Sequence, residues 1–159
     1  MIIDSQIKSA NDIKKIKMKI IPYSNDHKAD YLGLWYRATK IGHPFLSEEQ
    51  LSEKRDALAN TYLDMAEGYV MMDNGTLVGT LALFDNMIVG LFVDPDLHGK
   101  GIGKKVVEFA ANLKGELLVE VFEENVGAPD FYRAVGFKDH EEKYDENFPD
   151  HRLLILMRS

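Results

Sequence analysis

The residues of this chain that most clearly suggest chemistry lie at positions 98–103, which read His-Gly-Lys-Gly-Ile-Gly. They stand between an apolar, strand-like run at 87–93 and a helix-like run at 102–113. A glycine-rich turn at the start of a helix presents backbone N–H groups that together bind an anion, phosphate above all. Three neighbouring lysines add positive charge: Lys100, Lys104 and Lys105. The pattern predicts a phosphate-binding turn, and the alternative is an ordinary tight turn between a strand and a helix.

The spacing of the glycines in this turn argues against two common nucleotide sites. Gly99, Gly101 and Gly103 follow G-x-G-x-G, whereas dinucleotide-binding folds need G-x-G-x-x-G. The G-x-x-x-x-G-K-[ST] string of a P-loop does not occur in the sequence. Glycine allows positive φ angles and lets the backbone come close to a ligand. We therefore expect a diphosphate-binding turn of another kind, and a Rossmann or P-loop nucleotide-binding protein is disfavoured.

Length and composition narrow the class of protein. The 159 residues are 45% hydrophobic and 28% charged, which is typical of one globular domain. A net charge of −7 argues against nucleic-acid binding and suits a cationic partner such as a lysine side chain or a polyamine. Without cysteine, the chain has no disulfide, thiol nucleophile or thiolate metal site. No apolar run reaches membrane-spanning length and the N-terminus does not resemble a signal peptide, so we expect a cytoplasmic protein without a membrane partner.

The elements that must position the turn are predicted from periodicity and turn residues. Residues 1–16 are polar and lysine-rich and are expected to form an N-terminal extension, with one domain at 17–159. Strands are expected at 17–21, 69–72, 76–84, 87–93, 117–122, from Gly136 onward and at 153–157. Helices are expected at 26–40, from Ser47 onward, at 102–113 and at 125–135. The order predicts an α/β fold in three layers around a mixed sheet.

The first two helices carry more detailed predictions. The buried face of the first is expected to hold the following residues: Ala29, Leu32, Trp35, Tyr36 and Thr39. Ser47 and Gln50 form a capping box that begins the second helix. Its apolar stripe is expected to continue through the following residues: Leu51, Leu58, Tyr62 and Met65. Asn74-Gly75 favours a tight hairpin, and Gly90 within a strand suggests a bulge or a close backbone approach.

Two segments carry a resemblance to a known family. Residues 93–103, Val-Asp-Pro-Asp-Leu-His-Gly-Lys-Gly-Ile-Gly, resemble the acetyl-CoA signature Gln/Arg-x-x-Gly-x-Gly/Ala of the GNAT N-acetyltransferase superfamily. Residues 125–137, Asn-Val-Gly-Ala-Pro-Asp-Phe-Tyr-Arg-Ala-Val-Gly-Phe, resemble its N-x-x-A-x-x-F-Y-x-x-x-G-F segment. The resemblance covers about residues 17–158. Trp35 and residues 43–47 and 91–95 are also similar to a small bacterial branch of the superfamily, the YjaB-like acetyltransferases.

The resemblance implies both a fold and an activity. The fold would be a mostly antiparallel sheet of six to seven strands flanked by about four helices, with two splayed strands forming the acetyl-CoA cleft. The activity would be transfer of an acetyl group from acetyl-CoA to a primary amine by direct attack in a ternary complex, without a metal. The acceptor would be a small-molecule amine or a protein lysine or N-terminus, and a homodimer is possible by analogy. The alternative is a CoA-binding or degenerate sensor domain without turnover.

The resemblance also implies which residues bind acetyl-CoA. They are the strand residues Leu91, Phe92 and Val93, the turn residues His98, Gly99, Lys100, Gly101, Ile102, Gly103 and Lys104, and Asn125, Phe131 and Tyr132. One position departs from the signature, because His98 stands where the family has glutamine or arginine. Histidine is mostly neutral at pH 7. We therefore expect weakened cofactor binding, and Asn125 has an alternative interpretation as a helix cap.

The catalytic roles implied by the resemblance fall on two residues. Tyr132 is the candidate acid that protonates the departing thiolate, and its alternative is a core aromatic. Glu120 is the candidate base for the amine, because it lies on the opposite strand face from its valine neighbours. Glu123, Asp85 and His43 are weaker candidates for the base, each with the alternative of a solvated surface residue.

The acceptor site is expected where the first two helices meet. Four residues are assigned to it: Trp35, Tyr36, His43 and Phe45. The alternative is that these side chains form a small packed aromatic core. The sequence leaves open the identity of the acceptor, because specificity resides in variable loops.

Overall fold

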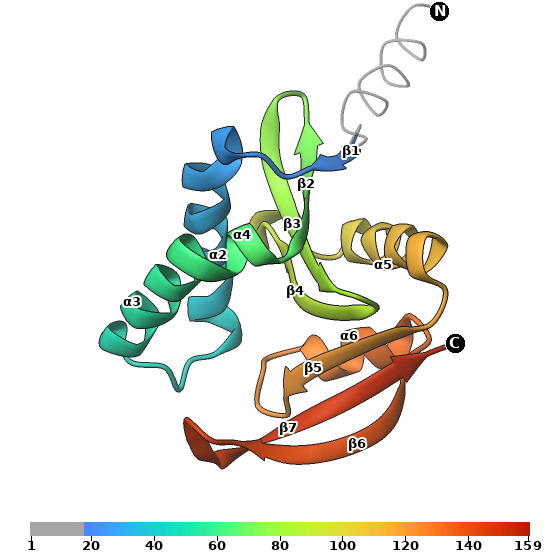
Figure 1. The fold of residues 1–159 in the computed structure, drawn as a ribbon. Coiled ribbons are helices and arrows are strands. Elements are labelled where there is room, and N and C mark those ends of the chain that lie inside the picture. The colour runs from blue at the N-terminus through green and yellow to red at the C-terminus, as the bar shows by residue number, and fades with distance from the viewer. Residues whose placement is uncertain (1–17) are drawn as a thin grey trace, which may run out of the picture.

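The computed structural model describes residues 18–159, so the predicted extension at 1–16 lies outside the described residues. Within these residues the chain forms one seven-stranded sheet with strand order β1-β2-β3-β4-β5-β7-β6 (Figure 1). The strands are β1 Met18–Pro22, β2 Glu67–Asp73, β3 Thr76–Phe84, β4 Met87–Val93, β5 Leu117–Phe122, β6 Lys138–Asp145 and β7 Phe148–Arg158. The helices are α2 Lys28–Gly42, α3 Glu48–Ala57, α4 Leu63–Met65, α5 Ile102–Lys114 and α6 Ala128–Ala134, with short η1 Asn25–His27, η2 Leu58–Tyr62 and η3 Pro95–Leu97.

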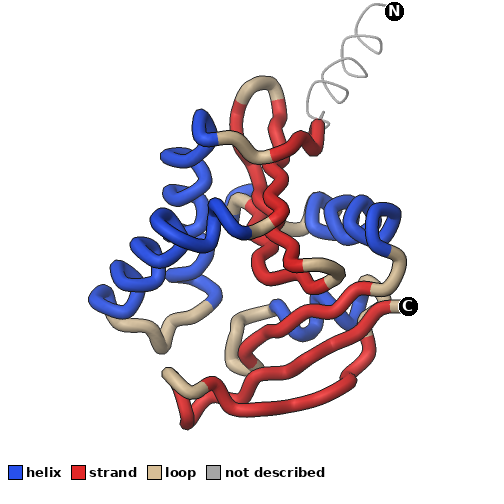
Figure 2. The backbone as a smooth tube through the Cα atoms, viewed as in Figure 1, coloured by secondary structure: helices blue, strands red, loops and turns tan. Residues whose placement is uncertain are grey.

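The helices cover the two faces of the sheet and confirm the predicted three layers. On one face α2 packs against β3 and β4, and α3 lies against α2. On the other face α5 contacts β4 and β5, while α6 contacts β5 and β7 (Figure 2). Each face has its own apolar core, one around Tyr31 and Leu34 of α2 and a larger one around Val106 and Val107 of α5. In residues 18–159 no helix is long and apolar enough to cross a membrane.

Local turn chemistry places the central strands as the sequence predicts. Asn74 and Gly75 both have positive φ, at 49° and 81°, which is the mirror-image turn that matches the twist of a hairpin. Asp85 has a φ of 49° in the next turn. The bounds of β3, β4 and β5 coincide with the predicted 76–84, 87–93 and 117–122.

The point of the fold that matters most for function is the separation of β4 from β5. These strands form the parallel pair of the sheet, and they are paired only at Met87 with Leu118 and Ile88 with Val119. The register between β3 and β4 shifts at the same place, because Leu83 pairs with Ile88 whereas Ala82 pairs with Gly90. The extra residue bends β4 away from its neighbour. The bulge predicted at Gly90 and the splayed strands are thus both confirmed (Figure 1).

The buried face of the first helix differs from the predicted one. The chain begins the helix with the 3₁₀ turn η1, and α2 itself starts at Lys28. The buried side chains are Tyr31, Leu34, Trp35 and Thr39. The predicted Ala29 is exposed and Leu32 and Tyr36 are only half-buried, because the face that meets β3 and β4 is rotated by about one residue from the predicted stripe.

The second helix is interrupted by a π-helical segment that the sequence analysis missed. The capping box is confirmed, since the Ser47 hydroxyl accepts from Gln50 N at 3.1 Å and Ser47 N donates to Gln50 Oε1 at 2.8 Å. Beyond α3, η2 widens the turn, so that Leu63 N donates to Leu58 O. The wider turn shifts the apolar stripe by one residue. Leu63 is buried in place of the predicted Tyr62 and Met65, which are 51% and 64% exposed.

Candidate active site

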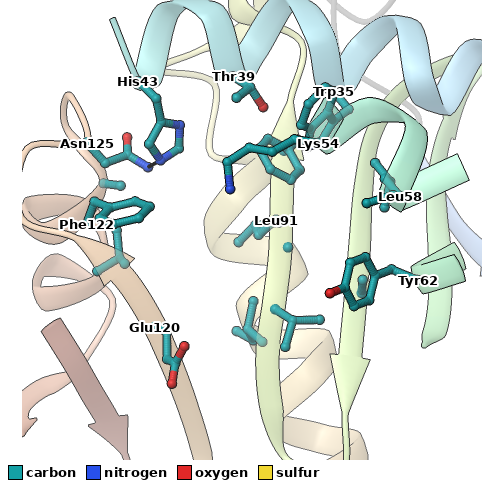
Figure 3. Close-up of a pocket in the computed structure, with 18 of the residues that line it drawn as sticks. Trp35, Thr39, His43, Lys54, Leu58, Tyr62, Leu91, Glu120, Phe122 and Asn125 are labelled. Atoms are coloured by element: carbon teal, nitrogen blue, oxygen red, sulfur yellow. Dashed lines mark hydrogen bonds between the residues drawn. The ribbon is translucent and has the colours of Figure 1, made fainter. Parts of the chain in front are cut away.

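A cavity of about 860 Å³ opens where β4 and β5 separate, a size that suits a small-molecule site. Its walls come from α2, α3 and η2 on one side and from β5, α6 and β7 on the other, with β4 between them (Figure 3). Beyond Ile88 the edge of β4 that faces β5 has no strand partner within residues 18–159. Backbone groups on such an edge are available to a ligand that enters the cavity.

The predicted anion-binding turn lies between the end of β4 and the start of α5. Gly99 and Gly101 have φ values of 80° and 79°, which L-residues other than glycine rarely adopt. Gly101 is the N-cap of α5 and no side chain caps this helix end. The first N–H groups of a helix have no partner inside the helix, so they remain free to bind an anion. Lys100, Lys104 and Lys105 are exposed and make no ion pair within the part of the chain that the structure describes.

Two features hold the turn in place. The Asp94 carboxylate accepts from Asp96 N at 3.0 Å and lies 3.4 Å from Arg37 Nη2, which fixes the short helix η3 before the turn. His98 Nε2 lies 3.2 Å from the carbonyl oxygen of Val93. Since a carbonyl only accepts, the Nε2–H of His98 donates to it. The imidazole is therefore turned back toward the end of β4.

Gly103 in the first turn of α5 allows a close contact with α6. A Cβ at this position would lie 2.8 Å from Phe131 Cζ and 2.9 Å from its Cε1. The Phe131 ring in turn packs edge-on against Tyr132 at a centroid distance of 5.1 Å, and Tyr132 packs against Phe137 at 5.3 Å. The turn and Tyr132 are therefore connected through one row of aromatic rings.

Tyr132 is buried and lines the cavity. Burial raises the pKa of its hydroxyl well above the usual value, because the phenolate would lose its hydration. The hydroxyl therefore stays protonated at neutral pH, which is the state that a general acid requires. The core and the catalytic interpretations of this residue are compatible, since its ring packs in the core and the residue also lines the cavity.

Glu120 projects from the middle of β5 into the cavity (Figure 3). Its neighbours Val119 and Val121 are buried on the opposite strand face, as predicted. Glu120 Oε1 lies 2.8 Å from Lys143 Nζ on β6, so this carboxylate is held in place by an ion pair. Of the other candidates for the base, Glu123 is clamped by both ends of the Arg152 guanidinium, which lowers the pKa of that carboxyl.

His43 lies at the end of α2 and is largely enclosed. Asn125 Nδ2 lies 3.2 Å from His43 Nε2, and an amide nitrogen only donates, so this imidazole nitrogen accepts. Burial, followed by the positive charge of Lys54, lowers the pKa of His43 from 6.5 to about 4. The ring is therefore neutral at pH 7.

The structure also tests the cap interpretation of Asn125. That interpretation is wrong, because α6 begins at Ala128 with Gly127 as its N-cap and no side-chain cap.

The neutral state of His43 predicts how stability depends on pH. The pKa in the folded state, about 4, is below the unfolded value of 6.5, so the unfolded chain binds the extra proton first. The contribution of His43 is complete above pH 6.5 and is lost as the pH falls toward 4, by at most about 3 kcal/mol. In urea titrations at pH 7 and pH 4.5, His43→Phe should lose less stability on acidification than the native chain. The same change at exposed His140 is the control, and equal losses in all three proteins would contradict the prediction.

The structure brings together three of the four residues assigned to the acceptor site. Trp35 and His43 line the cavity, and the Phe45 ring meets His43 edge-on at 5.7 Å. Tyr36 does not line the cavity and points elsewhere, since its hydroxyl donates to Glu48 Oε2 at 2.7 Å. The packed aromatic alternative is correct in part, because Phe45 belongs to a cluster with other rings: Phe122, Phe148 and His151.

Sequence reasoning missed three further side chains of this site, and Lys54 is the one for which the sequence held a signal. It extends from α3 into the cavity (Figure 3). Its position three residues after Leu51 and four before Leu58 places it on the inner helix face, and that spacing was the available signal. The contributions of Phe148 and His151 had no such signal, because they depend on where β7 starts.

Comparisons with known proteins agree with this geometry. Residues 64–139 match the model of a family described as "Acetyltransferase (GNAT) domain". The chain is 36% identical over 110 residues to peptidyl-lysine N-acetyltransferase YjaB of Escherichia coli (strain K12), which covers 69% of this chain and 74% of that protein. It superposes on the solution structure of apo-form YjaB from Escherichia coli with a TM-score of 0.79 at 31% identity, over 88% of this chain and 96% of the other. It also shares the fold of PaiA N-acetyltransferase from Thermoplasma acidophilum in complex with coenzyme A, with a TM-score of 0.74 at 17% identity over 91% and 99% of the chains.

Proposed function

The chain belongs to the GNAT family of N-acetyltransferases and is an acetyl-CoA-dependent acyltransferase, and from this premise we propose that its acceptor is the ε-amine of a lysine in a peptide or protein. The observation that carries the proposal is the cavity at the splayed strands, next to the uncapped start of α5. The similarity of the chain to a peptidyl-lysine N-acetyltransferase indicates the class of acceptor. We also propose that residues 17–159 form the single domain that carries this activity.

The charge and shape of the cavity favour such an acceptor. Three carboxylates stand in its walls, from Glu53, Glu120 and Asp145, and the whole chain carries a net charge of −7. A cationic side chain is attracted to this surface. Two exposed apolar residues, Tyr62 and Val89, also belong to the walls and offer contacts to neighbouring residues of a peptide. A cavity with both kinds of contact suits a long, flexible side chain with a terminal amine.

The residues of the site divide into cofactor and catalytic roles. We assign the pyrophosphate of acetyl-CoA to the free N–H groups between Gly99 and Lys104, because glycines with positive φ and an uncapped helix end fit an anion there. The pantetheine arm would lie along the unpaired edge of β4 at residues 91–93. Tyr132 would protonate the departing thiolate, and Glu120 would accept the proton of the amine directly or through water. Phe131 would support the N–H groups of the turn through its contact with Gly103.

The test of the proposed function is transfer to defined acceptors. The full chain is mixed with acetyl-CoA and one acceptor at a time: an internal-lysine peptide with a blocked N-terminus, the same peptide with arginine instead of lysine and a free N-terminus, or spermidine. Thiol release and peptide mass are measured together. We expect acetylation of the lysine peptide alone. Faster transfer to spermidine or to the free N-terminus would overturn the proposed acceptor, and coenzyme A binding without any transfer would favour a sensor domain.

The unusual histidine of the turn gives a prediction about cofactor affinity. His98 Nε2 donates to the Val93 carbonyl, so the imidazole is turned toward the end of β4, and it stands where the family signature has glutamine or arginine. His98→Arg places a permanent cation beside the turn, and we expect the Kd for acetyl-CoA to fall by about 3- to 10-fold. Isothermal titration calorimetry at low salt measures this change. An unchanged or weaker affinity would show that His98 holds the turn through Val93 better than an arginine can.

A further inference from the structure

Lys54 places a primary amine of the protein itself inside the cavity. Its side chain leaves α3 and extends toward the centre of the space between His43 and Leu91 (Figure 3). Its Nζ lies 4.9 Å from the centre of the Phe148 ring, which holds a cation by its electron-rich face. The residue is half-buried. Within residues 18–159 its ammonium group makes no ion pair with a carboxylate.

This arrangement distinguishes Lys54 from lysines elsewhere on the surface. Lys40 Nζ is paired with Glu48 at 3.0 Å, and Lys114 Nζ with Glu67 at 2.9 Å, in each case away from the cavity. Lys143 is held by Glu120 at 2.8 Å. An amine engaged with a carboxylate is kept protonated and in place. Lys54 has a long flexible side chain and an aromatic neighbour, and no carboxylate of residues 18–159 pairs with it, so its amine is free to move within the cavity.

The position of Lys54 is also that of an acceptor. It enters the cavity from α3, and Glu120 of β5 and Tyr132 of α6 line the same cavity. These are the residues proposed above for removal of the amine proton and for protonation of the thiolate. Proximity of this kind raises the effective concentration of the nucleophile far above that of any amine in solution.

We propose that Lys54 is an intramolecular acetylation site, modified by the same cavity that acetylates lysine peptides. The inference rests on the proposed function. In the step, the Lys54 ammonium first loses one proton, and the neutral amine then attacks the thioester carbonyl carbon. The C–N amide bond forms, the C–S bond breaks, and the thiolate takes a second proton from the nitrogen by way of the acid. The products are Nε-acetyl-Lys54, coenzyme A as the thiol and one proton released to solvent.

The modification would change the acceptor side of the site. Acetyl-lysine is neutral and longer than lysine, so the group would fill space next to Phe148 that an incoming lysine must use. The repulsion between Lys54 and a cationic substrate would vanish at the same time. Because we expect the loss of space to outweigh the loss of repulsion, the modified protein should transfer acetyl groups to peptides more slowly than the unmodified one.

The test uses the full chain and acetyl-CoA with a deuterated acetyl group, so that new label differs in mass from acetylation acquired during expression. Site occupancy is followed with time by peptide mass spectrometry at two protein concentrations. We expect Lys54 to be labelled about 100-fold faster than Lys40, with a rate that does not depend on protein concentration. Lys54→Arg should remove this fast label and Lys40→Arg should not. The main measurement is the rate of labelling of Lys54 relative to Lys40 in the native chain, so the result does not depend on whether either variant folds.

The outcomes separate this inference from the proposed function. Fast, concentration-independent label on Lys54 supports it. Label that accumulates equally on exposed lysines, or a rate at Lys54 that rises with protein concentration, overturns it. Acetylation of the lysine peptide by the same preparation with no label on Lys54 overturns the inference and leaves the proposed function standing, whereas absence of both reactions overturns both.

Discussion

Tyr132→Phe is expected to lower kcat for acetyl transfer by about 10²- to 10⁴-fold, the range typical of losing a positioned general acid. The hydroxyl of this residue stays protonated because burial raises its pKa, and the residue lines the same cavity as Glu120. The substitution removes only that group and leaves the ring in its row with Phe131 and Phe137. Since the step lost is protonation of the thiolate, the Kd for acetyl-CoA should change little.

Tyr36→Phe is the matched control for this experiment. Its hydroxyl donates to Glu48 outside the cavity, so its loss should leave kcat close to that of the native chain. Steady-state kinetics of both variants with a lysine peptide, together with thermal melts, compare the two changes. A kcat for Tyr132→Phe within about twofold of the native value would exclude Tyr132 as the acid, because general acid catalysis contributes far more than that.

The parts of the fold that depend on neighbouring residues were predictable from the sequence. Asn74-Gly75 specifies its own turn, Ser47 and Gln50 specify the start of α3, and a glycine at 90 marks the bulge. Each of these signals is local because the residue type determines the backbone conformation at that point. The bounds of β3, β4 and β5 followed from such turns.

The parts that depend on distant contacts were not predictable from those signals. The cap alternative for Asn125 depended on a local signal, yet the side chain contacts His43, which is 82 residues away. The π-helical segment η2 changes which side chain is buried after Leu58, and no residue type in the sequence predicts such a segment. Tyr36 was placed with the acceptor residues by spacing alone, and the contact with Glu48 that turns it away arises only when α3 packs against α2.

Gly103→Ala is expected to destabilise the protein although it replaces glycine within a helix. Alanine normally stabilises a helix over glycine by about 0.5–1 kcal/mol. At this position the new Cβ would lie 2.8 Å from the Phe131 ring, so the ring or the helix must shift. Overpacking of this kind costs about 1–3 kcal/mol. The net expectation is a loss of about 1–2 kcal/mol in the free energy of unfolding, or several degrees in Tm.

Gly33→Ala separates the clash from the helix propensity, because Gly33 lies in α2 and a Cβ there would meet nothing within 4 Å. It should raise the free energy of unfolding by about 0.5–1 kcal/mol, the full gain from alanine. The difference between the two variants in urea titrations then measures the cost of crowding Phe131. Because that ring packs against Tyr132, Gly103→Ala should also lower kcat, whereas Gly33→Ala should not. Equal stabilisation by both substitutions would show that Phe131 moves freely and that the turn and Tyr132 are not coupled through it.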